Sequence, residues 1–325
     1  MQPFSADEIE AAQRIVYAAM PPTPQYAWPL LRERVGAEVW VKHENHTPLG
    51  AFKLRGGLVY LQGLAQREPG CQGVISATRG NHGQSIAFAA RRHGLGATIV
   101  VPHGNSVEKN AAMRALGAEL IEHGSDFQQS REHAAKIAGD LGLHFVPSFH
   151  RDLVRGVASY WVEFFRAVQP AVVFVPVGQG SGICACIAAR AHTGATTRIV
   201  GVVSAHARAY LESFLLGRSV EAPVSTVLAD GMACRVPDEE PLAWIRREVD
   251  DIVAVTDDEV AAAMRALFSD THNVAEGAGA ASLAAAMQQR ERWRSKAVGV
   301  TLCGGNVDRE LYARVLAGDE GKGWR

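Results

Sequence analysis

The chain has 325 residues, which at about 150 residues per domain is enough for two domains, each with its own hydrophobic core. With 47% apolar and 21% charged residues it is not a bulk-disordered chain, and no apolar run reaches the roughly 20 residues of a membrane-spanning helix. The 33 basic and 34 acidic side chains leave a net charge of −1, without the basic excess of proteins that hold nucleic acid, so we expect neither a membrane nor a nucleic-acid partner.

Short β-rich runs alternate with helical patterns in the first half of the chain. The pattern predicts strand, helix, strand, helix, strand, helix and strand at Gly73–Ser76, Asn81–His93, Ala97–Pro102, Val107–Leu116, Ala118–Glu122, Phe127–Leu141 and His144–Pro147. Such alternation is typical of a parallel sheet whose strands are joined by right-handed helical crossovers.

A second set of elements follows the same alternation. We predict helices at Leu153–Val168, Ile183–His192, Asp258–Phe268 and Ala280–Gln289, and strands at Ala171–Val177, Arg198–Ser204 and Ala297–Leu302. A continuous apolar run such as AVVFVPV is typical of a strand that is buried on both faces. The stretch from Gly217 to Pro237 has no regular pattern and is predicted to be a surface loop.

The two sets predict an α/β protein with two open, twisted, mostly parallel sheets flanked by helices. We expect a small domain over residues 68–150 and a larger domain built from residues 1–67 and 151–325. Ligands of such sheets bind at the carboxyl ends of the strands, where four unusual segments lie: Ser76–His82, Gly178–Gly182, Ser204–His206 and Cys303–Asn306. A fifth such segment, His43–Gly57, precedes a helix, so one cleft at the domain junction should collect most of the five.

The sequence VGQGSGI joins a buried strand to an Ala-rich helix at residues 177–183. Glycines let backbone N–H groups approach an anion, the helix N-terminus adds positive potential, and Ser181 offers a hydroxyl, so these features favour a phosphate. The spacing G-x-G-x-G and the lack of an acid after the next strand disfavour a nicotinamide dinucleotide, and the missing G-K-[ST] excludes a P-loop. A tight turn that simply needs small residues is the alternative.

Lys53 follows Gly50 and Phe52 at the predicted start of a helix. The positive end of the helix dipole disfavours a charged amine and lowers its pKa, as an imine-forming lysine requires. From this residue alone, an ordinary surface lysine is the alternative. Taken together, a phosphate loop and a candidate imine lysine indicate pyridoxal phosphate.

Several segments resemble, in the same order, the motifs of the serine/threonine dehydratase and serine racemase family, whose members are fold-type-II pyridoxal-phosphate enzymes. They are GAFKLRGG, SATRGNHGQS, GQGSG, LADG, AEGAGA and LCGGNVD, and with their flanking residues they extend from residue 43 to residue 308. The resemblance implies a fold like that of the tryptophan synthase β subunit, with the cofactor at the domain junction.

The resemblance also implies roles for individual residues. Lys53 would form the imine with the cofactor and then act as the base on the substrate Cα–H, Phe52 would pack beside the ring, and Asn81 would hydrogen-bond the ring's 3′-oxygen. The cofactor phosphate would be bound by Gly178, Gln179, Gly180, Ser181 and Gly182. The substrate carboxylate would be bound by backbone N–H groups of the loop Thr78, Gly80, Asn81 and His82.

Three further residues stand at family motif positions. Cys303 replaces the Ser that faces the pyridine nitrogen in many members, and like Ser it would leave that nitrogen unprotonated, which favours β-elimination; a small buried Cys at a strand end is the alternative. Glu276 is expected to help shape the cofactor pocket, or simply to start a helix. Asp230 is a weak candidate ligand for Mg²⁺ or Ca²⁺, because Ser225 and Thr226 stand where a further carboxylate would be needed.

Arg79 is the most informative departure from the family pattern. It aligns with the Ser that serves racemases as acid and base on the cofactor face opposite the lysine, and a guanidinium stays protonated and cannot take that proton. We therefore expect weak racemisation. Arg79 is instead a candidate substrate-binding residue for a second, side-chain carboxylate. The alternative is that Arg79 points outward or pairs with a structural acid.

These observations favour an ammonia-lyase of amino-acid catabolism, similar to threonine and serine dehydratases. It would use pyridoxal phosphate to dehydrate and deaminate a small β-hydroxy amino acid, such as L-threonine, L-serine or 3-hydroxyaspartate, to a keto acid and ammonia. An amino-acid racemase or a β-replacement synthase on the same scaffold is the alternative, and a non-catalytic amino-acid-binding protein is a remote one.

The location and assembly of the protein are less strongly indicated. The five cysteines form no C-x-x-C pair and the N-terminus is polar and acidic, so we expect a cytoplasmic protein with reduced thiols. The family resemblance leads us to expect a homodimer. Because the chain ends soon after its last predicted helix, we expect no appended regulatory domain and no effect of isoleucine on activity.

Overall fold

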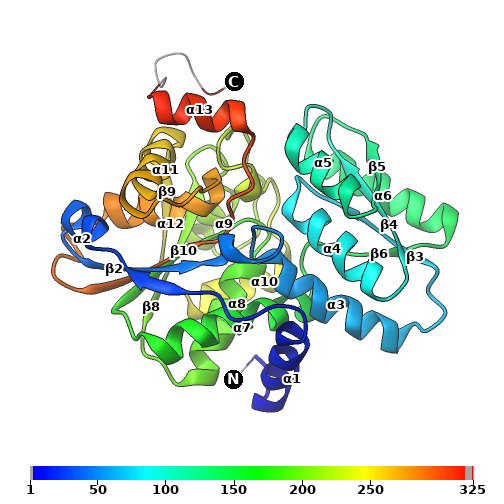
Figure 1. Cartoon of the computed structure of the whole chain (residues 1–325), viewed down its shortest axis with the longest axis horizontal. Helices are drawn as coiled ribbons and strands as arrows, with labels where there is room; N and C mark the ends of the chain where they lie inside the picture. The colour runs from blue at the N-terminus through cyan, green and yellow to red at the C-terminus, as the bar shows by residue number, and fades with distance from the viewer. Residues whose placement is uncertain (1–2, 319–323, 325) are drawn as a thin grey trace.

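The computed structural model describes residues 3–318 and residue 324, which form two sheets with helices on both faces of each (Figure 1). Within these residues the larger sheet has six strands, and its edge strand β1 is antiparallel to the rest. In spatial order the strands are β1 (Gln25–Ala27), β2 (Glu38–His43), β10 (Ala297–Leu302), β7 (Val172–Pro176), β8 (Arg198–Ser204) and β9 (Asp251–Val255). The predicted fold class is confirmed.

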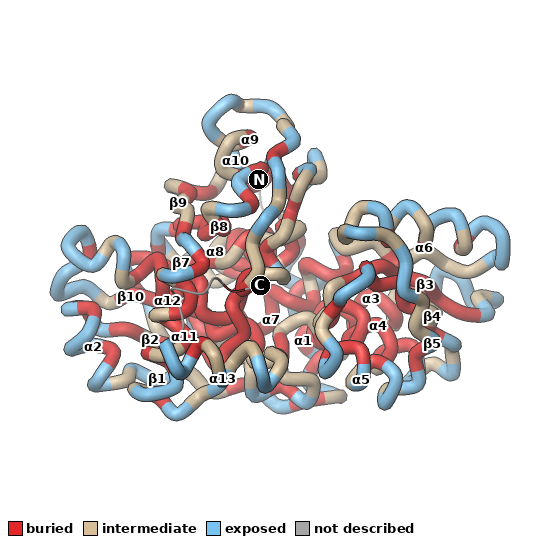
Figure 2. Tube along the Cα trace, turned by 90° about the horizontal axis from the view of Figure 1, so that it is seen from above, coloured by how far each residue is buried: buried red, intermediate tan, exposed pale blue. Residues whose placement is uncertain are grey.

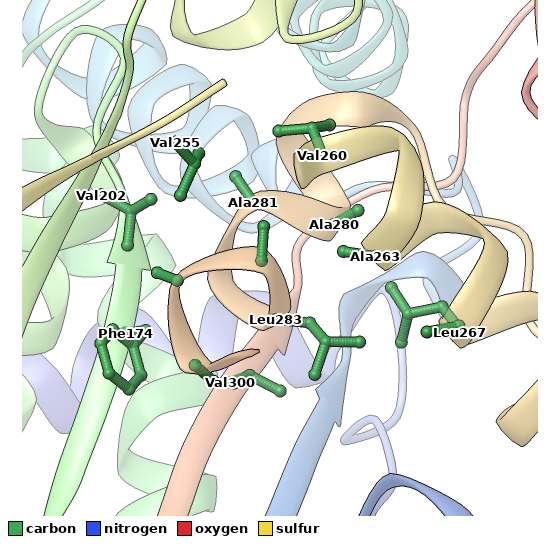
Figure 3. Packing of buried hydrophobic residues seen from close by; sticks show 14 of the residues in the cluster. Phe174, Val202, Val255, Val260, Ala263, Leu267, Ala280, Ala281, Leu283 and Val300 are labelled. Carbon is green, nitrogen blue, oxygen red and sulfur yellow. The ribbon is translucent and has the colours of Figure 1, made fainter. Parts of the chain in front are cut away.

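The central strands of the larger sheet are buried on both faces because their side chains alternate between two hydrophobic layers. In β7, Val173 and Val175 face the layer of α7, α8 and α10, whereas Val172 and Phe174 face the layer of α11 and α12. These helices span Arg151–Ala167, Ser181–Thr193, Glu239–Glu248, Asp257–Thr271 and Gly277–Gln288. Figure 3 shows the second layer, in which strand residues face α12 and α12 packs against α11, through Phe174, Val202, Val255, Ala280, Leu283, Val260 and Leu267.

Shorter elements complete this part of the molecule. They are α1 (Ala6–Tyr17), α2 (Pro29–Val35), α9 (Ala209–Leu216), α13 (Arg309–Ala317) and the 3₁₀ turns η1 (Glu44–His46) and η2 (Asp230–Met232). Helix α1 packs against α7 and α3, and α2 and α13 pack against α11.

The smaller sheet has four parallel strands, in the order β5 (Glu119–Glu122), β4 (Gly96–Val101), β3 (Gly73–Ala77) and β6 (His144–Phe145). One face is covered by α3 (Lys53–Arg67), α4 (Asn81–Arg92) and α5 (Val107–Ala115), and the other by α6 (Phe127–Leu141). Figure 2 shows buried chain at the centre of both parts and exposed loops at their edges. The division into domains at residues 68–150 stays a prediction.

Helix α3 is held between the two parts of the molecule. It crosses α7 in backbone contact: a Cβ added at Gly156 would lie 2.2 Å from the carbonyl oxygen of Arg55, and one at Gly56 would lie 2.9 Å from that of Leu153. The fully buried guanidinium of Arg55 donates hydrogen bonds to Glu44 at 2.7 Å and to Glu163 at 2.6 Å. These contacts fix the first turn of α3, which begins at Lys53.

The predicted helices and strands are all present, with ends shifted by a few residues. The elements that the sequence patterns did not predict are α1, β1, α2, β2, α9, α10, β9 and α13. Strand β2 lacks an apolar end because its last residues, Lys42 and His43, are polar although both are fully buried. Helix α1 did carry a usable signal, since Ser5 and Glu8 form a capping box.

The prediction of an irregular surface loop over residues 217–237 is correct for the first part, where Arg218, Glu221, Pro223 and Ser225 are exposed, and wrong for residues 228–234. Leu228, Ala229, Met232 and Cys234 are buried, because this segment packs beneath α12 and forms part of a cleft wall. Among the described residues, no helix combines the length and apolar character needed to cross a bilayer.

Gly156→Ala should destabilise the protein by about 3 kcal/mol, because its methyl group would be forced into the backbone of α3. Gly139→Ala is the matched control: Gly139 is an exposed residue of α6 with open space at its Cβ, so alanine there should stabilise by about 0.5–1 kcal/mol. Denaturant unfolding measures both changes. Equal effects of the two substitutions would contradict the close crossing of α3 and α7.

Candidate active site

A cleft lies where the carboxyl ends of strands from both sheets meet the start of α3. Its lining comes from residues 77–82 after β3, residues 178–182 after β7, Thr301 and Cys303 at the end of β10, Phe52 and Lys53, and residues 230–233, 276 and 278. The prediction that one cleft collects most of the unusual segments is confirmed for these. Ser204–His206 is the segment that does not line the cleft, and His206 is exposed.

Lys53 is half-buried in this cleft, and its amine has no counter-charge. Its Nζ donates a hydrogen bond to Ser181 Oγ at 2.8 Å and lies 4.9 Å from the centre of the Phe52 ring. No acidic side chain forms an ion pair with it within the described part of the chain. Burial lowers the pKa of Lys53 from its ordinary value to about 8, which Cys303 opposes only in part. The amine is therefore available in its neutral form near physiological pH.

The glycine loop leads directly into α8. Gly180 has φ of 92° at the N-cap, and no side chain caps the helix, so the N–H groups of its first turn have no side-chain partner. A Cβ at Gly178 or at Gly180 would collide with the chain itself, so these two glycines are required by the turn whatever the ligand. At Gly182 a Cβ would make ordinary van der Waals contacts with the Phe52 ring at 3.7 Å and the carbonyl oxygen of Pro176 at 3.8 Å, so packing does not demand glycine there.

A second helix N-terminus, whose N-cap residue has no side chain, faces the same cleft. Gly80, with φ of 150°, precedes α4, and Thr78 Oγ1 accepts hydrogen bonds from the backbone N–H groups of Gly80 and Gly83 at 2.8 and 3.3 Å. His82 is buried, and burial together with the charge of Lys53 lowers its pKa to about 3, so its imidazole is neutral. The loop thus presents donors and a helix dipole without a competing anion of its own.

Arg79 lines the cleft and does not point away from it. Its Nε is buried without a hydrogen-bond partner, and within residues 3–318 its guanidinium makes no ion pair with any acid. Both parts of the alternative interpretation, an outward side chain or a structural partner, therefore fail. An unpaired guanidinium on a half-buried side chain beside a cleft favours binding of an anionic group from outside the chain.

A network of polar side chains lines another wall of the cleft. Asn81 Nδ2 donates to Glu276 Oε1 at 2.5 Å, and Lys109 Nζ lies 2.9 Å from both Glu276 Oε2 and Asp230 Oδ2. Lys109 was not predicted, because the sequence of α5 does not distinguish it from an ordinary exposed lysine. Its burial depends on two acids that lie more than a hundred residues away in the chain. The two carboxylates hold the pKa of Lys109 above its ordinary range.

Cys303 is buried in the cleft, and its Sγ donates to the carbonyl oxygen of Ala278 at 3.5 Å. Burial and the charge of Glu276 raise the pKa of this thiol above its usual range, so it stays protonated. Thr301, two residues earlier on the same face of β10, has a buried Oγ1 without a partner.

Asp230 has no set of metal ligands around it. Among residues 3–318 and 324, no three His, Cys, Asp or Glu side chains are grouped as a metal ion would need. The carboxylate of Asp230 is paired with Lys109.

Comparison with known proteins identifies relatives over nearly the whole chain. The family model described as pyridoxal-phosphate dependent enzyme matches residues 16–304. L-threonine ammonia-lyase of Thermotoga maritima is 31% identical over 96% of this chain and 78% of its own length. L-threo-3-hydroxyaspartate ammonia-lyase of Saccharomyces cerevisiae is 31% identical over 98% of both chains. A solved pyridoxal 5′-phosphate-dependent aspartate racemase superposes with a TM-score of 0.88, at 25% identity, over 95% of this chain and 98% of the other.

The rate at which the apoprotein takes up pyridoxal phosphate should rise with pH and level off above about 8, since only the neutral Lys53 amine is nucleophilic. Stopped-flow absorbance at fixed cofactor concentration measures this rate. Lys53→Ala, run in parallel, should show no covalent uptake. A midpoint near 10.5, the ordinary value for lysine, would show that the amine is not desolvated as described.

Proposed function

Because this chain belongs to the pyridoxal-phosphate-dependent enzyme family, we propose that it is an ammonia-lyase for a small β-hydroxy amino acid. Water is first eliminated from such a substrate, and hydrolysis of the resulting enamine then takes up one water and gives a keto acid and ammonia. The observation that carries the proposal is the buried, carboxylate-free amine of Lys53, 2.8 Å from Ser181 at the start of the helix that follows the glycine loop.

The side chains of the cleft suit pyridoxal phosphate. The uncapped N-terminus of α8 supports Gly178, Gln179, Gly180, Ser181 and Gly182 as the phosphate-binding residues, and the space at Gly182 leaves room beside Phe52. Lys53 reaches this end of the cleft, as the residue that binds the aldehyde must. Asn81, Thr301 and Cys303 offer an amide, a hydroxyl and a protonated thiol to the ring.

The bound cofactor supplies an electron sink for the negative charge that develops at the substrate Cα. The chain must supply the base that takes the Cα proton. Of the two lysines that line the cleft, Lys109 is kept charged by Asp230 and Glu276, whereas burial favours the neutral form of Lys53. We therefore assign the proton transfer to Lys53 Nζ.

The substrate carboxylate is assigned to the loop before α4. Backbone N–H groups of Asn81 and His82 lie at the N-terminus of α4, and Thr78 Oγ1 holds the turn by accepting from the N–H of Gly80. Arg79, from the same loop, is assigned to a second carboxylate on the substrate side chain. This makes 3-hydroxyaspartate a candidate substrate beside L-threonine and L-serine.

An amino-acid racemase is the second candidate, favoured by the similarity to the aspartate racemase. Racemisation needs a proton donor on the face of the cofactor opposite Lys53. The guanidinium of Arg79 stays protonated at physiological pH and cannot serve as that donor. We therefore rank the racemase below the lyase. A β-replacement synthase shares the early steps and differs in its second substrate.

We do not propose a divalent cation at Asp230, because the Lys109 ammonium already neutralises that carboxylate. The five cysteines are unpaired, which supports a cytoplasmic protein. A homodimer is proposed from the family resemblance alone.

Borohydride reduction of the holoprotein followed by peptide mapping should place the pyridoxyl label on Lys53, and Lys53→Ala should lower kcat by about 10³-fold or more. The substrate is identified by keto-acid release from L- and D-serine, threonine and the 3-hydroxyaspartate isomers, with chiral analysis of the remaining amino acid. EDTA should leave the rate unchanged. Inversion without keto acid would favour the racemase, and a label on another lysine would overturn the assignment.

Arg79→Ala should lower kcat/KM for 3-hydroxyaspartate by about 10- to 100-fold, the loss expected for a charge-assisted hydrogen-bonded pair. The value for L-threonine, which has no second carboxylate, should change little. Steady-state kinetics on both substrates measure the ratio. An equal loss on the two substrates would remove Arg79 as the second-carboxylate residue.

A further inference from the structure

A chain of polar contacts crosses the junction between the two sheets along one wall of the cleft. Lys109, in α5 beside the four-stranded sheet, contacts Asp230 and Glu276 from the part built on the six-stranded sheet, both at 2.9 Å. Asn81, at the start of α4, donates to Glu276 Oε1 at 2.5 Å and accepts at Oδ1 from Asn306 Nδ2 at 2.9 Å. The side chains of Lys109 and Glu276 are only 6% and 3% exposed, so water does not compete strongly for these contacts.

The orientation of the Asn306 amide follows from its neighbours. Its Nδ2 lies 2.8 Å from the carbonyl oxygen of Leu49, which can only accept a hydrogen bond, so the amide nitrogen must face that carbonyl. The second hydrogen of the same nitrogen points to Asn81 Oδ1. The oxygen of the Asn81 amide is therefore directed toward Asn306, and its nitrogen toward Glu276.

The Asn81 nitrogen carries two hydrogens, and one of them is donated in the hydrogen bond to Glu276. No contact within residues 3–318 uses the other, and Asn81 lines the cleft. The proposed function gives this group the 3′-oxygen of the cofactor ring, which needs a donor when it is ionised. Only the observed orientation of the amide supplies one.

We propose that Lys109 is a positioning residue that, acting through Glu276 and together with Asn306, keeps the nitrogen of Asn81 turned toward the cofactor, an inference that rests on the proposed function. An ionised Glu276 can only accept hydrogen bonds and so demands the nitrogen of Asn81, whereas a protonated Glu276 can also donate and would tolerate either end of the amide. Lys109 is the cation in contact with Glu276, and its charge favours the ionised form. Burial and the charge of Asp230 act in the opposite direction and raise the pKa of Glu276.

If Lys109 only held the two sheets together, its loss would have the same effect as the loss of another ion pair across the junction. Arg131 in α6 and Asp238 form another ion pair across the junction, at 3.6 Å. Neither of them contacts Glu276 or Asn81. Removal of the Arg131–Asp238 ion pair weakens the contact between the two sheets and leaves the orientation of Asn81 unchanged, so it serves as the control.

The experiment is a pH titration of the visible absorbance of bound pyridoxal phosphate in the wild type and in Lys109→Met, Lys109→Arg, Glu276→Gln and Arg131→Gln. A donor to the ring oxygen stabilises its ionised form, so loss of the donor should raise the pH midpoint. We expect an upward shift of about one pH unit in Lys109→Met and about tenfold weaker cofactor binding. Glu276→Gln should shift the pH midpoint in the same direction, and Lys109→Arg, which keeps the positive charge, should have the wild-type midpoint.

Arg131→Gln should titrate like the wild type. The proposal is wrong if Lys109→Met and Glu276→Gln keep the wild-type midpoint, or if Arg131→Gln shifts as far as they do. Should Lys109→Met fail to fold, the nearly isosteric Glu276→Gln carries the same comparison. Because the titration needs no substrate, it remains decisive even if no keto acid is ever released, so the two proposals fail separately.

Discussion

The cleft depends on an amine that is buried without a counter-charge. Taking a charged lysine out of water is costly, and the neutral form of Lys53 avoids that cost. A long lysine side chain would otherwise extend toward solvent, so its backbone must be held rigidly. The close crossing of α3 over α7 and the buried ion pairs of Arg55 with Glu44 and Glu163 provide that rigidity. The reactivity of the site therefore depends on packing contacts that never touch a ligand.

The electrostatics of the cleft follow from which charges the chain neutralises by itself. Lys109 is paired with two acids, whereas Arg79 and the N-termini of α4 and α8 have no acidic partner in the described residues. Unpaired positive groups at the ends of two sheets create a region that favours anions. A phosphate and one or two carboxylates are the anions that the proposed reaction requires there.

Most of the fold and several residues of the cleft could be predicted from local sequence patterns. The βα alternation predicted parallel strands because apolar runs and helical periodicity are properties of short segments, and the motifs carried Lys53, Asn81 and the glycine loop. Lys109 could not be predicted, because a lysine in an amphipathic helix is ordinarily exposed and only the approach of Asp230 and Glu276 makes its burial possible. The segment around Met232 was misjudged for a related reason: irregular sequence does not distinguish a surface loop from a wall that packs beneath a helix.

The sequence by itself determined the class of fold and the type of cofactor, and it supplied Lys53 as the proposed reactive amine, since these depend on residue types at short spacing. Only the tertiary structure decided that Arg79 lacks an acidic partner, that Ser204–His206 lies outside the cleft, and that Lys109 reaches Glu276. Such facts depend on distances between segments far apart in the chain. Those distances are set by how the two sheets pack across their junction, which no local pattern records.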